Sequence, residues 1–99
     1  MAVAIRWLDW TERDETHVTR HGVRVSEVNQ VLGNPHVLAK NPKGTDNSLF
    51  LIGHTDGGRA LTIVVSPTND TSVWRPITAY ASTQEHVNLW NSRFNRRKS

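Results

Sequence analysis

The chain has 99 residues and no cysteine, which predicts one small domain and excludes a disulfide framework or a thiolate metal site. No apolar run approaches the length of a membrane span and the first residues do not resemble an export signal, so we expect a cytoplasmic protein. The net charge is +3, but residues 93–99 hold four of the 12 basic residues, leaving 8 basic against 9 acidic residues in a body of residues 1–92. Global charge therefore does not predict a polyanion partner, and residues 93–99 are expected to form a basic tail.

The N-terminal third predicts one strand and two short helices. Residues 4–10 alternate in polarity like a strand, and Trp7 is expected in the core. Thr11 and Asp14 form a capping box for a helix that ends near Gly22. Ser26 is the predicted cap of a second helix, which ends at glycine and proline in residues 33–35.

The remaining residues predict four strands and a final helix. Residues 36–40 favour a short strand, and residues 48–55 and 59–67 favour a hairpin around a Gly-Gly turn. Residues 72–81 form the last predicted strand, and Ser82 with Glu85 begins a helix whose apolar stripe is Val87, Trp90 and Phe94. The order β-α-α-β-β-β-β-α predicts an α+β domain with an antiparallel sheet, two N-terminal helices and a C-terminal helix.

Arg75 is the most unusual residue of the last predicted strand. Strict alternation places Arg75 with Ala79 on one face, and Trp74 with Tyr80 on the other. A partly buried arginine needs an anionic partner. That partner is either an acid of the same chain, such as Asp9 or Glu85, or a phosphate held by two hydrogen bonds.

Other side chains of the sequence bear on metal binding and on base stacking. His17 and His21 have a spacing that can hold zinc, but no third ligand is evident, so we expect neither a metal site nor a cofactor. Trp74, on the predicted face of Tyr80, could stack on RNA bases, whereas Trp90 is expected in the core.

Several segments together resemble the BrnT family of bacterial type II toxins. They are RHGV, VLGNP, LIGHTDGGRALTIVV and WRPITAYASTQEHVNLW, in family order within about residues 7–91. The resemblance implies a RelE-like fold and an endoribonuclease that blocks translation. It also implies a ribbon-helix-helix antitoxin resembling BrnA as partner, with DNA bound only through that antitoxin.

The resemblance also implies site residues. Arg59 stands at the family's Gly-Arg position, Arg75 at the first arginine of the last strand, and His21 at a helix end. Tyr80 and Ala81 stand where the family has an arginine and a lysine. This loss of cations motivates an alternative, a catalytically depleted module that binds RNA or the antitoxin. A third interpretation is a structural subunit in which Arg75 is buried in a salt bridge.

Metal-free RNA cleavage needs a base for the 2′-hydroxyl, an acid for the 5′-oxygen and cations for the phosphate. We expect Arg59 and Arg75 to bind the scissile phosphate, because arginines stay charged and form two hydrogen bonds to phosphate oxygens. Tyr80, if nearby cations lower its pKa, or His54 would carry the protons. Trp74 and His21 complete the predicted RNA-binding residues.

Overall fold

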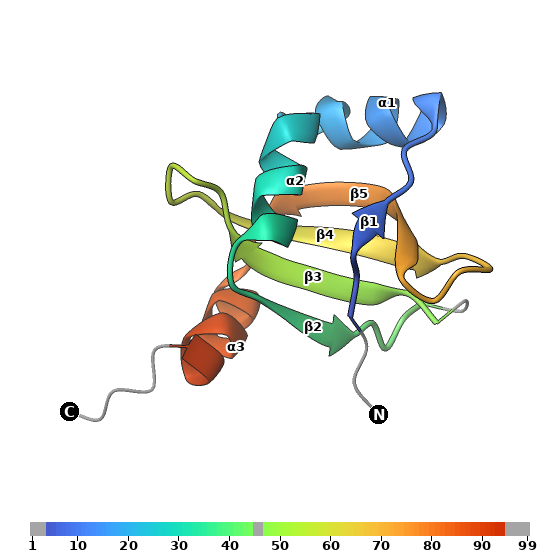
Figure 1. The fold of residues 1–99 in the computed structure, drawn as a ribbon. Helices are drawn as coiled ribbons and strands as arrows, with labels where there is room; N and C mark the ends of the chain where they lie inside the picture. The colour runs from blue at the N-terminus through green and yellow to red at the C-terminus, as the bar shows by residue number, and fades with distance from the viewer. Residues whose placement is uncertain (1–3, 45–46, 95–99) are drawn as a thin grey trace.

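A computed structural model describes residues 4–44 and 47–94. Figure 1 shows one curved sheet with helices around it. The elements in chain order are β1 (Trp7–Leu8), α1 (Glu12–Arg20), α2 (Val25–Gly33), β2 (His36–Lys40), β3 (Leu49–His54), β4 (Ala60–Pro67), β5 (Val73–Ala81) and α3 (Gln84–Phe94). This order and the α+β class confirm the prediction.

The strand order in the sheet is β1-β5-β4-β3-β2, and neighbouring strands from β2 to β5 are antiparallel. β1 instead pairs in parallel with β5, Trp7 opposite Val73. Strand β1 is much shorter than residues 4–10, because only two residues join the ladder. Trp7 is 66% exposed, so its predicted place in the core is wrong.

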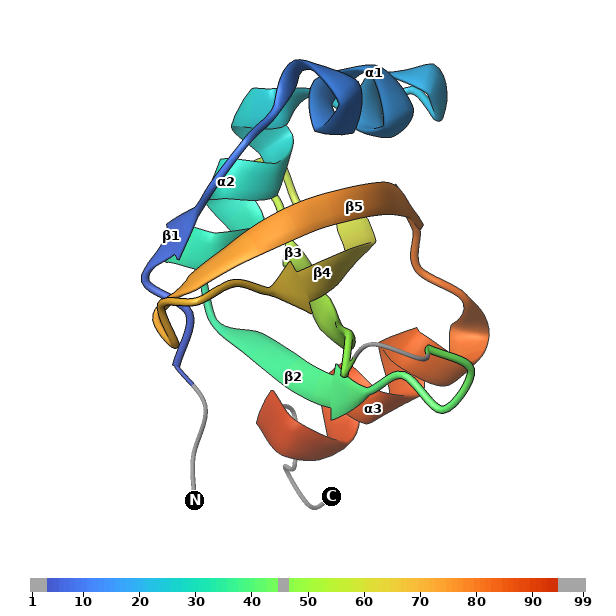
Figure 2. The ribbon, with the colours of Figure 1, turned by 90° about the vertical axis from the view of Figure 1, so that its right-hand side faces the viewer.

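The hydrophobic core lies between the sheet and the two N-terminal helices. Cross-strand neighbours Leu51 and Ile63 are both fully buried there, with Val18 of α1 and Val31 of α2. Because successive strand residues face opposite sides, Phe50 and Thr62 lie on the other face, toward α3. Figure 2 shows α1 and α2 on one side of the strands and α3 on the other.

The helix starts follow the predicted capping chemistry only in part. Thr11 and Asp14 form the capping box of α1, as predicted. At α2 the N-cap is Arg24, whose N–H donates to the carboxylate of Glu27 at 3.0 Å, so the prediction of Ser26 as cap is wrong. At the start of α3, Ser82 is the predicted cap, but the side chain that caps the helix is that of Thr83. Its hydroxyl accepts a hydrogen bond from the backbone N–H of His86.

A bulge interrupts the alternation of β5. Val64 pairs with Thr78 but Val65 pairs with Pro76, so Ile77 is an extra residue between the two pairs. The side chains before and after the bulge therefore change phase, and Trp74 belongs to the same core cluster as Ala79. The prediction that Trp74 shares a face with Tyr80 is wrong, because it assumed an uninterrupted strand.

The last predicted segment divides between described and undescribed residues. Arg93 and Phe94 form the last residues of α3, while Arg96, Arg97 and Lys98 lie outside the described residues. Trp90 of the same helix is half-buried and donates through Nε1 to the carbonyl of Pro35 at 3.1 Å. It lies outside the core cluster, contrary to the prediction. None of the helices in the described ranges has the length and hydrophobicity needed to span a bilayer.

Candidate active site

Arg59 lies at the end of the β3–β4 hairpin, and its guanidinium group contacts α2 and the segment that joins α1 to α2. Its Nη1 donates to the carbonyl of Gly22 at 3.1 Å and to both carboxylate oxygens of Glu27, at 3.0 and 3.2 Å. The pKa of Glu27 is lowered, first by the hydrogen bond from the backbone N–H of Arg24 and also by Arg59. Burial of the carboxylate opposes this shift without cancelling it. Arg59 therefore fastens the hairpin to the start of α2.

Arg75 forms an equally specific contact with α1. Its Nη2 lies 3.0 Å from Oδ1 of Asp14 and its Nε lies 3.3 Å from Oδ2. This carboxylate raises the pKa of Arg75, through the hydrogen bonds first and then through its charge, and Asp9 adds a weaker attraction. The acid that pairs with Arg75 is thus Asp14, a third acid besides Asp9 and Glu85.

The two arginines do not converge on one point. Arg75 is paired with Ser66 near the end of β4, whereas Arg59 precedes the first residue of that strand. At about 3.3 Å per strand residue, the seven residues from Arg59 to Ser66 put their backbones roughly 23 Å apart. Each side chain also turns toward a different carboxylate. In this arrangement the two guanidinium groups cannot bind the same phosphate.

The other predicted site residues are dispersed in a similar way. His21 is exposed at the end of α1, next to the Gly22 carbonyl that Arg59 contacts. Trp74 is only 7% exposed, and its Nε1 donates to the carbonyl of Thr71. Its indole face is therefore covered by the core rather than open to a base.

Tyr80 of β5 and His54 of β3 are both on the α3 face of the sheet, with β4 between their strands. Tyr80 is half-buried opposite Thr62, and burial raises the pKa of its phenol. The cation effect on which its predicted role depended is absent among the causes of this shift. The phenol of Tyr80 therefore stays protonated, so it is suited to donate a proton rather than to accept one. His54 packs its ring against the edge of Trp90, with centroids 4.4 Å apart.

A histidine that sequence reasoning missed lies between these elements. His86 of α3 is 8% exposed, and its Nδ1 lies 2.9 Å from Oγ1 of Thr62. Thr62 in turn lies 2.9 Å from Oγ of Ser82. The His86 ring is flanked by Phe50, 4.6 Å between centroids, and by Tyr80, 6.4 Å in a stacked arrangement. Its spacing of four from Trp90 was the available signal, since that spacing puts both residues on the helix face that meets the sheet.

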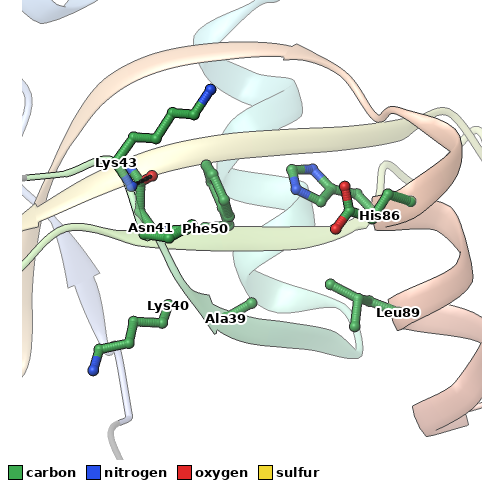
Figure 3. Close-up of a pocket in the computed structure, with 9 residues that line it drawn as sticks. Ala39, Lys40, Asn41, Lys43, Phe50, His86 and Leu89 are labelled. Atoms are coloured by element: carbon green, nitrogen blue, oxygen red, sulfur yellow. Dashed lines mark hydrogen bonds between the residues drawn. The ribbon is translucent and has the colours of Figure 1, made fainter.

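His86 lines a cleft of about 370 Å³ that lies between α3 and the end of β2. Figure 3 shows Lys40 and Lys43 on one side of this cleft, His86 and Leu89 on the other, and Phe50 between them. The remaining lining residues are Ala39, Asn41, Pro42 and Glu85. Lys43 and Glu85 bring one charge of each sign to the cleft, whereas Lys40 lies opposite Leu49 and points to the other face of the sheet. In the described part of the chain, no three acidic or histidine side chains gather as a possible metal site.

Comparison with known proteins gives one informative result. No family model and no curated protein matches the sequence. Among solved structures, the crystal structure of the Brucella abortus ribonuclease toxin BrnT aligns with 79% of this chain and 97% of its own, with a TM-score of 0.56 and 18% identity. The chain has a BrnT-like fold. The fold expected from the sequence resemblance is thereby confirmed.

Proposed function

We propose that this BrnT-like chain is the toxin component of a type II toxin-antitoxin system, an endoribonuclease that needs no metal and inhibits translation. The observation that carries the proposal is the fold shared with a ribonuclease toxin over 97% of that toxin's length. The ordered sequence motifs support it, because they resemble the same family. A cleft in which Lys43 lies near titratable side chains adds a place for the phosphate of RNA.

The groups available for the reaction lie on the α3 face of the sheet. Tyr80 is a protonated phenol that can give a proton to a leaving 5′-oxygen, and His54 is a second proton carrier predicted from sequence. Arg59 and Arg75 remain in the proposal as contacts to the RNA backbone. Since they stand at opposite ends of β4, they would bind different phosphates, with His21 beside Arg59.

The proposed partner is a ribbon-helix-helix antitoxin resembling BrnA, which would bind this chain and, separately, DNA. The sequence resemblance supports this partner, and the structural likeness to a toxin agrees with it. In this arrangement the chain itself contacts RNA and reaches DNA only through the antitoxin.

A second function is favoured by a specific observation. Both arginines are committed to carboxylates of the same chain, and Tyr80 and Ala81 replace cations of the family motif. A depleted site of this kind suits a module that binds RNA or the antitoxin without cutting. The two functions differ in one measurable property, cleavage of RNA by the folded chain.

Induction of the chain in bacteria tests the proposal, with labelled amino-acid uptake and mapping of RNA ends as readouts. We expect uptake to fall and RNA fragments with 2′,3′-cyclic phosphate ends to accumulate. Tyr80→Phe, which removes only the phenolic oxygen, should weaken both effects. Trp7→Ser, at an exposed position on a different edge of the sheet, should not. If the soluble parent chain changes neither uptake nor RNA, the binding module is the better description.

A further inference from the structure

Histidine is an unusual residue type at position 86, where α3 packs against the sheet. A leucine there would bury apolar area without further requirements, whereas a buried imidazole is costly unless its nitrogens are hydrogen-bonded. The sheet meets this requirement at Nδ1 with Thr62, a fully buried hydroxyl on the central strand β4. A polar site has therefore been built into the contact between α3 and the sheet.

The second ring nitrogen of His86 reaches solvent. Among the buried side-chain nitrogens and oxygens of the described residues, only Nε1 of Trp10 lacks a hydrogen-bond partner. Nε2 of His86 has no hydrogen bond in the structure either, so it must be accessible. The residue lines the cleft, which is the route by which Nε2 meets a ligand.

The hydroxyls of Thr62 and Ser82 can fix the tautomer of His86. When Nδ1–H donates to Oγ1 of Thr62, the Thr62 hydroxyl is free to donate to Ser82. Nε2 then carries a lone pair toward the cleft, which is the form of histidine that accepts a proton. Thr62 thus acts as a positioning residue, because it orients the ring without touching the ligand.

Charged and titratable groups around His86 suit a phosphodiester. From α3 itself comes Glu85, from β5 the phenol of Tyr80, and from β2 and the residues after it Lys40 and Lys43. Lys43 lies across the cleft from His86 (Figure 3), where its ammonium group can approach a phosphate oxygen. Lys40 lies opposite Leu49 in the sheet, and its side chain points away from α3. A proton acceptor and a cation therefore lie at one cleft, and the phenol ring of Tyr80 stacks beside His86, whereas the arginines are dispersed.

We propose that this cleft binds the scissile phosphate of RNA and that Nε2 of His86 is the catalytic base; the inference rests on the proposed function and names its site. His86 takes the proton of the 2′-hydroxyl as the bond from O2′ to phosphorus forms. The bond from phosphorus to O5′ breaks with its electron pair on O5′, which takes the phenolic proton of Tyr80. Lys43 offsets part of the charge of the phosphate, and proton exchange with water restores both His86 and Tyr80. The products are a 2′,3′-cyclic phosphate and a 5′-hydroxyl.

His54 is the competing base, and its surroundings distinguish it from His86. Its ring packs against Trp90, and it does not line the cleft that holds the lysines. The proposal therefore assigns His54 to the packing of α3.

The experiment compares the rate of RNA cleavage by the full chain with His86→Gln, Thr62→Val, His54→Gln and a control, His36→Gln. Gln can keep a hydrogen bond to Thr62, so the docking of α3 is retained, and thermal melting checks this. We expect His86→Gln to lower kcat by about 100-fold or more, the usual contribution of a general base. Thr62→Val should lower kcat less, and His36→Gln should leave it near the parent value.

The pH profile separates catalysis from packing. In the parent, log kcat should rise with a slope of one across the pH range in which histidines titrate. This limb should vanish in His86→Gln and survive in His54→Gln. Survival of the limb in His86→Gln, or its loss in His54→Gln, overturns the proposal.

A second measurement keeps the two proposals apart. A 2′-deoxy oligonucleotide has no attacking hydroxyl, so its binding can be followed by NMR of the histidine rings without cleavage. Cleavage by the parent together with unchanged His86 resonances on oligonucleotide binding overturns the inference alone. If the folded parent cuts no RNA, in solution or in a translating extract, the proposed function fails and this assignment fails with it.

Discussion

Arg75 joins strand β5 to helix α1 by donating to both carboxylate oxygens of Asp14, at 3.0 Å from Nη2 and 3.3 Å from Nε. The same carboxylate belongs to the capping box of α1, in which Thr11 is the other member. Asp14 is only 4% exposed at its side chain, while Arg75 is 40% exposed. One nearly buried acid therefore fixes both the start of a helix and its position against the sheet.

Removing Arg75 should destabilise the fold. Arg75→Ala leaves the Asp14 carboxylate buried without its cation, and an unmade bond of this kind costs about 1–3 kcal/mol. For a domain of this size, that corresponds to a fall in Tm of about 4 °C or more. Thermal melting measures it, and Arg13→Ala, at an exposed arginine of the same helix, is the control. An unchanged Tm for Arg75→Ala would show that the ion pair contributes nothing to stability.

Tyr80 should titrate above the ordinary tyrosine pKa of 10.0, because burial disfavours its phenolate. It is the one tyrosine of the chain, so ultraviolet absorbance of the phenolate reports it directly. Since its pKa is raised on folding, the stabilising contribution is complete below pH 10 and is lost as pH rises beyond that value. Tyr80→Phe should reduce this loss. A midpoint at or below pH 10.0 would contradict the buried position.

Glu27 should make the fold sensitive to acid. Its pKa lies below the ordinary 4.5 because of the N–H of Arg24 and the cation of Arg59. Its contribution is therefore present above about pH 4.5 and is lost as pH falls through the lowered value. Glu27→Gln should lower the free energy of unfolding by up to about 1 kcal/mol at pH 7, with a smaller difference near pH 3. Glu12→Gln is the control, and an equal difference at both pH values would exclude this role.

Gly53 should not tolerate a side chain. A Cβ there would lie 3.1 Å from Cγ1 of Val31 and 3.2 Å from both Cβ of His36 and the carbonyl of Pro35. Gly53→Ala would force α2 away from β3 and should cost about 1–3 kcal/mol in chemical denaturation. Gly33→Ala is a matched control, because a Cβ at that helix position has no neighbour within 4 Å. It should be neutral or slightly stabilising.

Local chemistry explains what could be predicted from the sequence. The hairpin around residues 56–58 and the capping box at Thr11 depend on residues close together in the chain, and both occur as predicted. The prediction of Ser26 as cap was wrong because the carboxylate of Glu27 accepts a hydrogen bond from the N–H of Arg24, and Arg24 is the N-cap. Two local motifs were available there, and sequence alone does not rank them.

The candidate site could not be predicted because it depends on register and on distant contacts. The extra residue Ile77 changes which side chains of β5 face the core, and no residue type marks a bulge in this strand. The pairing of Arg75 with Asp14 rather than Asp9 follows from how α1 crosses the edge of the sheet. The role of His86 can be recognised only once the structure places Thr62 within hydrogen-bond distance of its ring.

The parallel pairing of Trp7 with Val73 also has a consequence for how the protein is made. Closing this loop brings together two segments that are far apart in the chain, so its entropic cost must be met before the pairing can contribute. On the ribosome, β1 can take its place only after β5 has been made. The antiparallel strands β2 to β5 can assemble from neighbouring segments, and β1 then joins the sheet that they have formed.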